Sequence, residues 1–253
     1  MKLQEITWVD AQKYFETHDT VVIPLGSTEN HGSHLALGTD FLIPTRLCDY
    51  IEEDCDVLIT PVVPFGIADH HVSFPGTLTL GYEGLYMVIS KIAWQLYGYG
   101  ARKFIFLNGH GGNNPVLNSV CMELSAKGAV GTLVNWWQLA GDLNPAWKGG
   151  HGGAEETAAM LAIDPKYVKM EYYKERGEQD LSEGLKCCGM NAVDFQGISM
   201  MVPRLFDKFA PAGWYGPDDP VPATVEWGKE MLDTTGKFIA AYVNEFAKVK
   251  VEK

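Results

Sequence analysis

Short apolar runs alternate with helical stretches in the first half of the chain, and this alternation narrows the possible folds most. Four apolar runs are expected to form buried strands, at 21–25, 57–63, 103–107 and 130–136. Apolar residues at helical spacing lie between them, at 44–53, 84–99 and 115–127. Strands and helices that alternate in this way form βαβ units, so we expect a parallel sheet covered by helices on both faces.

Further elements are expected outside this core. Thr7 and the acidic turn that follows it predict a short helix. A strand is expected at 197–202 and a C-terminal helix at 224–249. The stretch 172–188 is charged and poorly periodic, so it is expected to be a loop or an irregular helix.

The composition favours one large domain that contains residues 1–253. The chain is 46% hydrophobic and has no linker-like stretch. A net charge of −12, with scattered Lys and Arg, argues against nucleic acid or a membrane as a partner. The N-terminus lacks the apolar segment of a secretory signal, and the five cysteines form no CxxC pair. A cytoplasmic location is therefore expected.

Polar clusters follow the first and third predicted strands, and another opens a later helical stretch. In chain order, their members are Glu29, His31, His34 and Asp40; Asn108, His110 and Asn113; and His151, Glu155 and Glu156. In α/β proteins, ligands bind beyond the carboxyl ends of the strands. Carboxylates and neutral imidazoles are the usual ligands of zinc, manganese and iron. The three clusters together therefore predict a metal site.

The number of candidate ligands favours two divalent ions over one. The expected ligands are Glu29, His31, Asp40, His110 and Glu156. Five are more than one tetrahedral zinc needs, and Asp40 could bridge two ions. Side chains that would hold the ligands in place are expected at His34, Asn108 and Asn113.

Other interpretations stay open at this point. A single loop histidine is more often a surface residue than a ligand. An oxyanion loop around His110 would need a G-x-S-x-G motif, which the chain lacks. The turn that contains His71 could contact substrate or only shape the chain. Tryptophans are usually core residues, and Trp147 is the exception because it lies four residues before His151.

These motifs resemble those of the creatininase (creatinine amidohydrolase) family. The matching segments, in family order, are Gly26-Ser27-Thr28-Glu29-Asn30-His31-Gly32 with His34, Gly38-Thr39-Asp40, Phe74-Pro75-Gly76-Thr77, Asn108-Gly109-His110-Gly111-Gly112-Asn113, and His151-Gly152-Gly153 with Glu156-Thr157. They lie between about residues 20 and 160, and the C-terminal third adds little.

The resemblance implies a three-layer α/β/α fold with a mostly parallel sheet, often assembled as a homohexamer, with a binuclear site of zinc, manganese or iron. By motif, Glu29, Asp40 and His110 would hold one ion, and His31 with Asp40 the other. Creatininase itself has a further glutamate ligand where this chain has Gly112. We expect Glu156 to replace it, ahead of Glu155.

The resemblance also implies roles outside the ligand set. His151 matches a histidine that shuttles protons, and Trp147 matches a tryptophan that covers a ring substrate. The expected catalytic residues are therefore His151 and Glu156, and the expected substrate contacts are Trp147, His71 and His34.

The expected function is a dinuclear metal-dependent hydrolase that cleaves an amide or opens a small polar ring by metal-activated water. Gly112 weakens creatinine as the substrate. One alternative is hydrolytic C–C cleavage of a cyclic diketone such as 3-dehydro-scyllo-inosose. The other is a metal-dependent protein that binds a small molecule without turnover.

Overall fold

Four parallel strands form the central sheet in the computed structural model, which describes residues 1–251. The sheet order is β2-β1-β3-β4, with β1 at Thr20–Leu25, β2 at Leu58–Ile59, β3 at Lys103–Asn108 and β4 at Val130–Asn135. All residues of β1 and β3 are buried, and Leu25 pairs with Asn108. The two central strands therefore end at the same level, and the loops that follow them start side by side.

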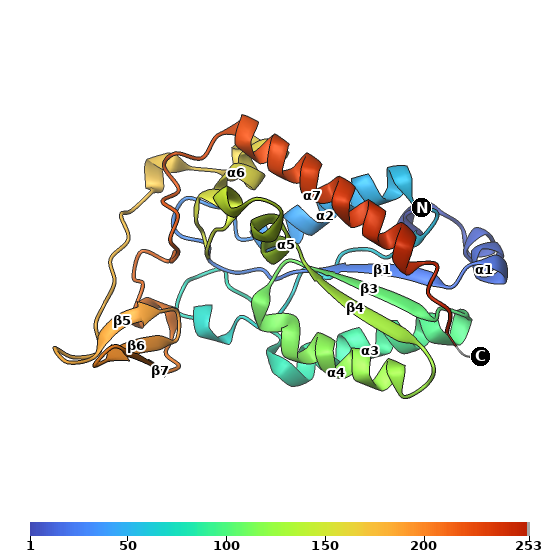
Figure 1. Cartoon of the computed structure of the whole chain (residues 1–253), viewed down its shortest axis with the longest axis horizontal. Helices are drawn as coiled ribbons and strands as arrows, with labels where there is room; N and C mark the ends of the chain where they lie inside the picture. Colours follow the sequence, from blue (N-terminus) through green and yellow to red (C-terminus); the bar gives the residue numbers. More distant parts are fainter. Residues whose placement is uncertain (252–253) are drawn as a thin grey trace.

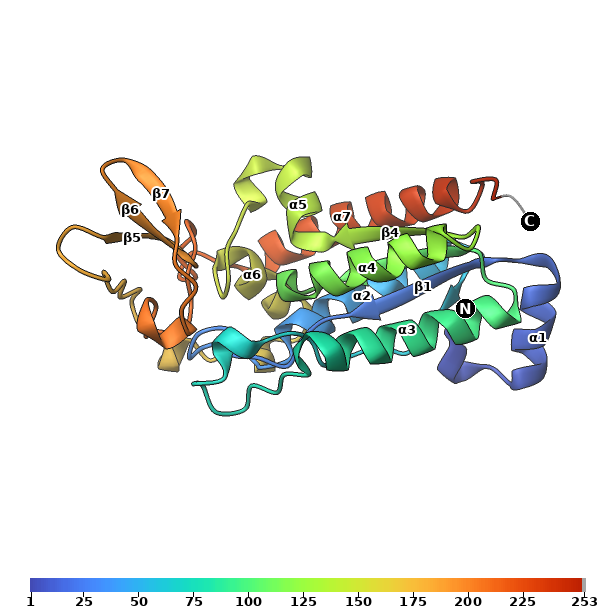
Figure 2. The same cartoon turned by 90° about the horizontal axis from the view of Figure 1, so that it is seen from below.

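Helices cover both faces of this sheet (Figures 1 and 2). One face carries α3 (Gly81–Tyr99) and α4 (Asn114–Ser125); the other carries α2 (Thr39–Asp54), α5 (Trp136–Leu143), α6 (Ala154–Ile163) and α7 (Val225–Phe246). The short helix α1 (Trp8–Thr17) precedes β1, and Thr7 caps it as predicted. The three-layer α/β/α fold with a parallel central sheet is confirmed.

Each face of the sheet has its own apolar core, because successive strand residues point to opposite sides. Phe104 and Phe106 of β3 pack toward α3 and α4. Ile105 and Leu107 pack toward α2 and α7. This two-sided burial fixes the ends of β1 and β3 firmly in the middle of the molecule.

Two element boundaries differ from the sequence prediction. Helix α2 begins at Thr39, whereas a helix was expected at 44–53, so Pro44 lies inside the helix and Asp40 lies on its first turn. Within the run at 57–63, which was expected to be broken by Pro61, strand β2 covers only Leu58–Ile59, and an isolated bridge between Val63 and Leu25 resumes the pairing after the proline.

The fourth predicted strand is also shorter than expected, since α5 starts directly after β4. The prediction of strand at Trp136 was wrong: this residue opens the helix and is fully buried. Its indole packs in the core instead of continuing the sheet.

A separate antiparallel sheet projects from the end of the molecule toward which the central strands run (Figure 1). Its strands are β5 (Lys186–Gly189), β6 (Ala192–Phe195) and β7 (Ile198–Met201). The strand expected at 197–202 is β7, but it joins this small sheet. Within residues 1–251, no helix has the length and apolar character of a membrane span.

Candidate metal centre

Six buried or nearly buried side chains converge beyond the carboxyl ends of β1 and β3: Glu29, His31, Asp40, His110, His151 and Glu156. Their ligand atoms form three overlapping groups, each within 4.8 Å: Glu29, Asp40 and His110; His31, Asp40 and Glu156; and Glu29, His31 and His151. All five residues expected as ligands are therefore brought together, from two strand ends and the starts of two helices.

Asp40 reaches the centre because the start of α2 is wedged between the ends of β1 and β3. Pro44 has no N–H to bond the carbonyl group of Asp40, four residues earlier. That carbonyl packs against glycines: a Cβ atom at Gly109 would lie 1.8 Å from its oxygen, and one at Gly26 would lie 2.2 Å from it. Both strands must therefore be followed by glycine for Asp40 to take this position.

Asp40 presents one carboxylate oxygen to each of two histidines. Its Oδ1 lies 2.9 Å from His31 Nε2, and its Oδ2 lies 3.0 Å from His110 Nδ1. His110 Nδ1 is also 3.2 Å from Glu29 Oε1, and His31 Nε2 is 3.7 Å from Glu156 Oε2. Asp40 thus stands between a Glu29–His110 pair and a His31–Glu156 pair, as a bridging ligand would.

The other ring nitrogen of each histidine is bonded to a backbone carbonyl. Nδ1 of His31 donates to the oxygen of Glu29 at 3.1 Å, and Nε2 of His110 donates to the oxygen of Ile67 at 2.8 Å. A carbonyl only accepts, so these nitrogens carry the proton. In the neutral rings, the nitrogens that face the carboxylates therefore present lone pairs, as metal ligands do.

Without a metal, protons occupy these positions. Burial lowers the pKa of His31, but the charges of Asp40 and Glu156 outweigh it and raise the pKa to about 10. Burial also opposes charging of His110, yet Glu29 and Asp40 hold its pKa well above 6.5. Burial raises the pKa of Glu156 to about 7. A divalent cation would replace several protons at once.

The carboxylates themselves fit a cation. Both oxygens of Glu29 and Oδ2 of Asp40 are buried and accept no hydrogen bond within the described chain. Neighbouring imidazole nitrogens lie 3.0–3.8 Å away without completing one. Buried carboxylates are costly unless they are paired or coordinate a metal. Three carboxylates and two imidazole lone pairs are a donor set suited to zinc, manganese or iron.

His71 approaches Glu29 from outside this donor set. The Asn30 amide is oriented by the backbone: its Oδ1 accepts from Gly32 N at 3.1 Å, and its Nδ2 donates to the Gly213 oxygen at 2.8 Å. That Nδ2 also faces His71 Nδ1 at 3.4 Å, which leaves the His71 proton on Nε2. Nε2 lies 3.3 Å from Glu29 Oε1, so the protonated nitrogen of His71 faces this carboxylate without completing a hydrogen bond. Its predicted contact with substrate stays a prediction.

No side chain fits at position 112. A Cβ atom at Gly112 would lie 2.3 Å from the Ile67 oxygen and 2.5 Å from His110 Nε2, the two atoms that form the hydrogen bond described above. A carboxylate here would break the contact that orients His110. Glycine at position 112, where a glutamate was noted in creatininase, is therefore required for the orientation of His110 in this chain.

Glu156, and not Glu155, lies among the candidate ligands. Oε2 of Glu156 accepts the backbone N–H of Gly152 at 2.7 Å, which turns the carboxylate toward His31. Glu155 is turned toward Gly149, since a Cβ atom at that glycine would lie 2.5 Å from Glu155 Oε2.

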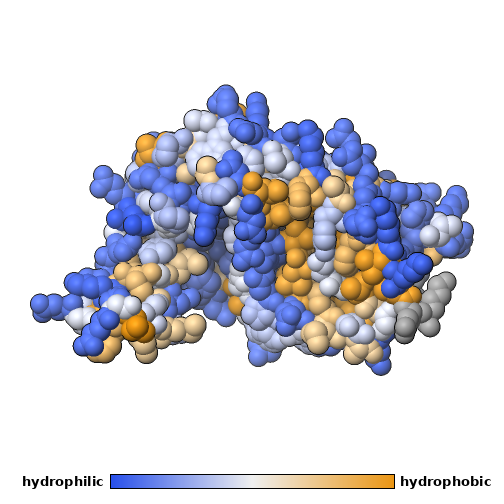
Figure 3. Space-filling model, viewed as in Figure 1, coloured by the Kyte–Doolittle hydropathy of each residue, from blue (hydrophilic) through white to orange (hydrophobic). Residues whose placement is uncertain are grey.

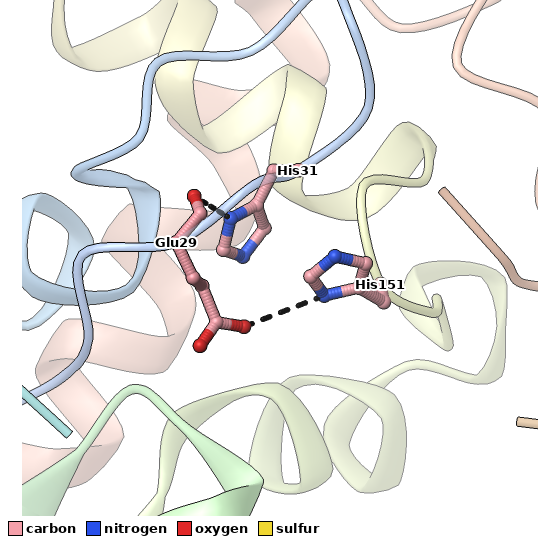
Figure 4. A group of neighbouring side chains, drawn as sticks. All are labelled: Glu29, His31 and His151. Atoms are coloured by element: carbon pink, nitrogen blue, oxygen red, sulfur yellow. Dashed lines mark hydrogen bonds and ion pairs between the residues drawn. The ribbon is translucent and has the colours of Figure 1, made fainter. Parts of the chain in front are cut away.

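His151 enters from the loop before α6, and its ring lies beside that of His31, tilted by 34° (Figure 4). The ring centroids are 4.3 Å apart, and His151 Nδ1 lies 3.8 Å from Glu29 Oε1. Burial lowers the pKa of His151 well below 6.5, so the ring is neutral. Its Nε2 is buried without a hydrogen-bond partner in the described residues.

Phe206 covers these imidazoles and was missed by the sequence reasoning. The side chain is fully buried, with its ring centroid 4.4 Å from that of His71 and 4.8 Å from that of His151. It lies in a 3-10 turn at Phe206–Lys208, after the small sheet. A single phenylalanine in an aperiodic segment carries no sequence signal, because only the fold brings it here.

The two other side chains expected to contact substrate, His34 and Trp147, are buried. His34 Nε2 is 3.2 Å from the hydroxyl of Thr157, and burial lowers the pKa of His34 to about 4. Trp147 is 6% exposed and belongs to the apolar core that includes α7, and its predicted contact with substrate stays a prediction.

Asn108 and Asn113 act on the backbone around His110, as expected for supporting residues. Asn108 Nδ2 donates to the His110 oxygen at 2.7 Å. Asn113 Nδ2 donates to the Gly26 oxygen at 3.0 Å, and its Oδ1 accepts from Ile67 N at 3.1 Å. These amides tie the loop after β3 to the loop after β1.

Sequence comparisons connect this geometry to known proteins. The family model for creatininase (creatinine amidohydrolase) matches residues 4–243. Creatinine amidohydrolase from Pseudomonas putida is 28% identical over 190 residues, covering 66% of this chain and 73% of that protein. The mycofactocin precursor peptide peptidase of Mycobacterium tuberculosis is 33% identical over 170 residues, covering 62% and 64%. The 3-dehydro-scyllo-inosose hydrolase of Thermotoga maritima is 26% identical over 180 residues, covering 67% and 58%.

Solved structures share the fold over nearly the whole chain. A manganese form of creatininase aligns with a TM-score of 0.77 at 22% identity, covering 98% of this chain and 99% of that one. A mutant creatininase of the Zn–Zn type aligns with a TM-score of 0.76 at 22% identity, covering 98% of both chains. At such identities the likeness establishes the fold.

Proposed function

The chain belongs to the creatininase family, and we propose that it is a metal-dependent hydrolase that cleaves an amide bond in a small polar or cyclic substrate. The observation that carries this proposal is the position of Asp40, with one oxygen toward His31 and the other toward His110. A buried carboxylate shared in this way suits a centre with two divalent ions.

We assign the ligands by the two groups that share Asp40. One ion would be held by Glu29, Asp40 and His110, and the second by His31, Asp40 and Glu156. When bound, a pair of divalent ions supplies an activated water and polarises the carbonyl under attack. The hydrogen bonds from His31 and His110 to backbone carbonyls keep both rings oriented for this task.

We assign the proton transfer to His151. The ring is neutral before the reaction because burial lowers its pKa. It can therefore accept the proton that the attacking water loses, and a low pKa makes the protonated ring a strong acid toward the leaving nitrogen. Its position beside Glu29 and His31 places it at the edge of both ligand groups.

A small substrate is supported by how closed the centre is. Glu29 and His31 are 0% exposed, and the Phe206 ring packs over His71 and His151. Two relatives, the creatinine amidohydrolase and the peptide peptidase, have names that denote amide cleavage. We therefore place this chain among the C–N hydrolases.

The second candidate function is hydrolytic C–C cleavage of a cyclic diketone. It is favoured by the likeness to the 3-dehydro-scyllo-inosose hydrolase. Divalent ions held by the same ligands would stabilise the enolate that a carbon leaving group requires. The products separate the two reactions, because C–N cleavage releases ammonia or an amine and C–C cleavage gives an acyclic keto acid.

The test is turnover of a panel by protein stripped of metal and reloaded with zinc or manganese. The panel contains cyclic amides, short peptides and cyclic polyol ketones, with products identified by mass spectrometry. Metal-dependent release of an amine or ammonia supports the proposal. Two bound ions with no turnover of any panel member would contradict it and favour a binding protein.

We further propose that the protein forms a homo-oligomer, as the family resemblance implies. Strand β4 is an edge of the sheet, and apolar side chains gather on the face seen in Figure 3, over α7 and β4. On α7, Phe238 is 47% exposed and Tyr242 is 37% exposed. Light scattering on the purified protein tests this, and a monomer at micromolar concentration would contradict it.

A further inference from the structure

We propose that residues 213–218, a segment we call the strap, position the His31–Glu156 half of the centre and set the affinity of the ion bound there. The strap reads Gly213-Trp214-Tyr215-Gly216-Pro217-Asp218 and precedes α7. The inference rests on the proposed function, since it takes two ions per chain as its premise.

The strap first holds the backbone on both sides of His31. The Gly213 oxygen accepts from Gly32 N at 2.7 Å and from Asn30 Nδ2 at 2.8 Å. Gly213 has a φ of +82°, and a Cβ atom there would lie 2.4 Å from Asn30 Oδ1. One carbonyl thus fixes the residues before and after His31.

The strap next pairs with the loop that carries His151. Tyr215 N donates to the His151 oxygen at 2.8 Å, in an isolated antiparallel bridge. The two backbones pack closely, because a Cβ atom at Gly150 would lie 2.5 Å from the Cα atom of Gly216. Side chains at either glycine would push the strap away from His151.

The strap finally caps the helix that presents Glu156. Gly153 is the N-cap residue of α6 and offers no side chain. Asp218 supplies the missing acceptor from elsewhere in the chain: its Oδ2 accepts the backbone N–H of Glu155 at 3.0 Å. A carboxylate at a helix N-terminus satisfies an otherwise free N–H and complements the helix dipole. Asp218 therefore acts as a positioning residue for Glu156, the next residue.

The other half of the centre is held by contacts of its own, and the strap reaches it only through Asn30, whose amide faces His71. Glu29 N bonds the Leu37 oxygen, and Asp40 and His110 are held at the ends of the central strands. In the chain as described, no hydrogen bond of the strap reaches Asp40 or His110. A substitution in the strap should therefore weaken the binding of one ion and leave the binding of the other unchanged.

The experiment compares Asp218→Ala and Asp218→Asn with Asp219→Ala in the full-length protein. Asp219 is the exposed neighbour, and its carboxylate bonds Tyr173 and Val221. Two stepwise zinc affinities are measured by chelator competition, with metal counts by mass spectrometry. The visible spectrum of the cobalt-loaded protein reports the geometry at each ion, and thermal melting reports the fold.

We expect Asp218→Ala to weaken one zinc affinity by roughly 10–100-fold, as loss of a supporting residue commonly does. The second affinity should stay unchanged, and only one component of the cobalt spectrum should alter. Asp218→Asn keeps an acceptor oxygen and should recover part of the loss, and Asp219→Ala should match the wild type.

An equal loss of affinity for both ions, or no loss for either, would overturn the inference. If Asp218→Ala fails to fold, the comparison of Asp218→Asn with Asp219→Ala tests the inference. A selective loss of one zinc affinity in Asp218→Asn would still support the positioning role of the strap. A wild-type protein that binds fewer than two ions would refute the proposed function itself, and that result is visible before any variant is made.

Discussion

The two halves of the candidate centre are held in place by different parts of the molecule. Glu29, Asp40 and His110 belong to the ends of the two central strands and to the helix wedged between them. His31, His151 and Glu156 lie in a loop and at a helix start that the strap joins. The first half is held rigidly by a sheet that is buried on both faces. The second half is held by a few hydrogen bonds from the strap, in the C-terminal third of the chain.

This difference teaches where such a centre can vary. Position 112 lies in the rigid half, where no side chain can be added without displacing His110. The carboxylate near His31 comes from Glu156, which belongs to the strap-held half. The two positions differ in their surroundings, because a side chain is excluded at 112 whereas the start of α6 presents a carboxylate at 156.

The largest effect is expected from Asp40→Asn, because Asp40 faces both halves. Loss of its charge should release both ions and abolish measurable turnover. Asp49→Asn is the matched control on the same helix, since Asp49 makes surface ion pairs with Lys2 and Arg46. Two tightly bound ions in Asp40→Asn, counted by mass spectrometry, would break the proposed division into halves.

The next effect is expected from His151→Ala, which tests the proton role. The rate should fall by ~10²–10⁴-fold, as is common for loss of a general acid–base residue. Both ions should stay bound in this variant. This result would distinguish a proton carrier from a metal ligand, because His151 also forms a possible ligand group with Glu29 and His31. An unchanged kcat would rule out the proton role, and His18→Ala serves as a surface control.

A smaller effect on stability should distinguish two adjacent glycines. Gly112→Ala forces a Cβ atom against Ile67 and His110, so overpacking should cost roughly 1–3 kcal/mol. At Gly111 the added atom would meet only Trp137, at an ordinary 3.7 Å. Gly111→Ala should therefore melt like the wild type, whereas equal melting temperatures for the two variants would contradict the steric argument.

The smallest effect concerns pH and the metal-free protein. The folded pKa of His31 is raised to about 10, above the ordinary 6.5, so its contribution to stability is complete below pH 6.5 and is lost as pH rises toward 10. Above pH 7 the histidines with lowered pKa values, His34, His70, His71 and His151, are neutral in both states and add nothing.

Melting curves at pH 7 to 9 check this expectation. The metal-free protein should lose thermal stability as pH rises, and the metal-loaded protein should lose less because an ion replaces the proton on His31. A metal-free protein whose melting temperature rises over this interval would contradict the proposed pairing of His31 with Asp40.

The sequence was sufficient to predict the half that the sheet holds. Apolar runs that are followed by glycine and histidine predict both the strands and the candidate ligands after them, since strand ends of a parallel sheet share one edge. Glu29 and His110 are evident for this reason. Asp40 was expected in a loop, because Pro44 resembles the start of a helix, and the structure places it on the first turn of α2.

The sequence could not predict what holds the other half. The strap has no periodicity, and its role lies in backbone contacts such as those of Gly213 with Gly32 and Asn30. Phe206 and Asp218 act on residues more than fifty positions away, so only the folded chain reveals their partners. The role of Trp147 was inferred from its closeness to His151 in sequence and from the resemblance, and the structure shows this indole packed in the core.

The most direct test of the whole account is anomalous X-ray diffraction from crystals of the zinc-loaded protein. The account predicts two peaks, one bounded by Glu29, Asp40 and His110 and the other by His31, Asp40 and Glu156, with Asp40 contacting both. A single peak, or two peaks that do not share Asp40, would contradict it.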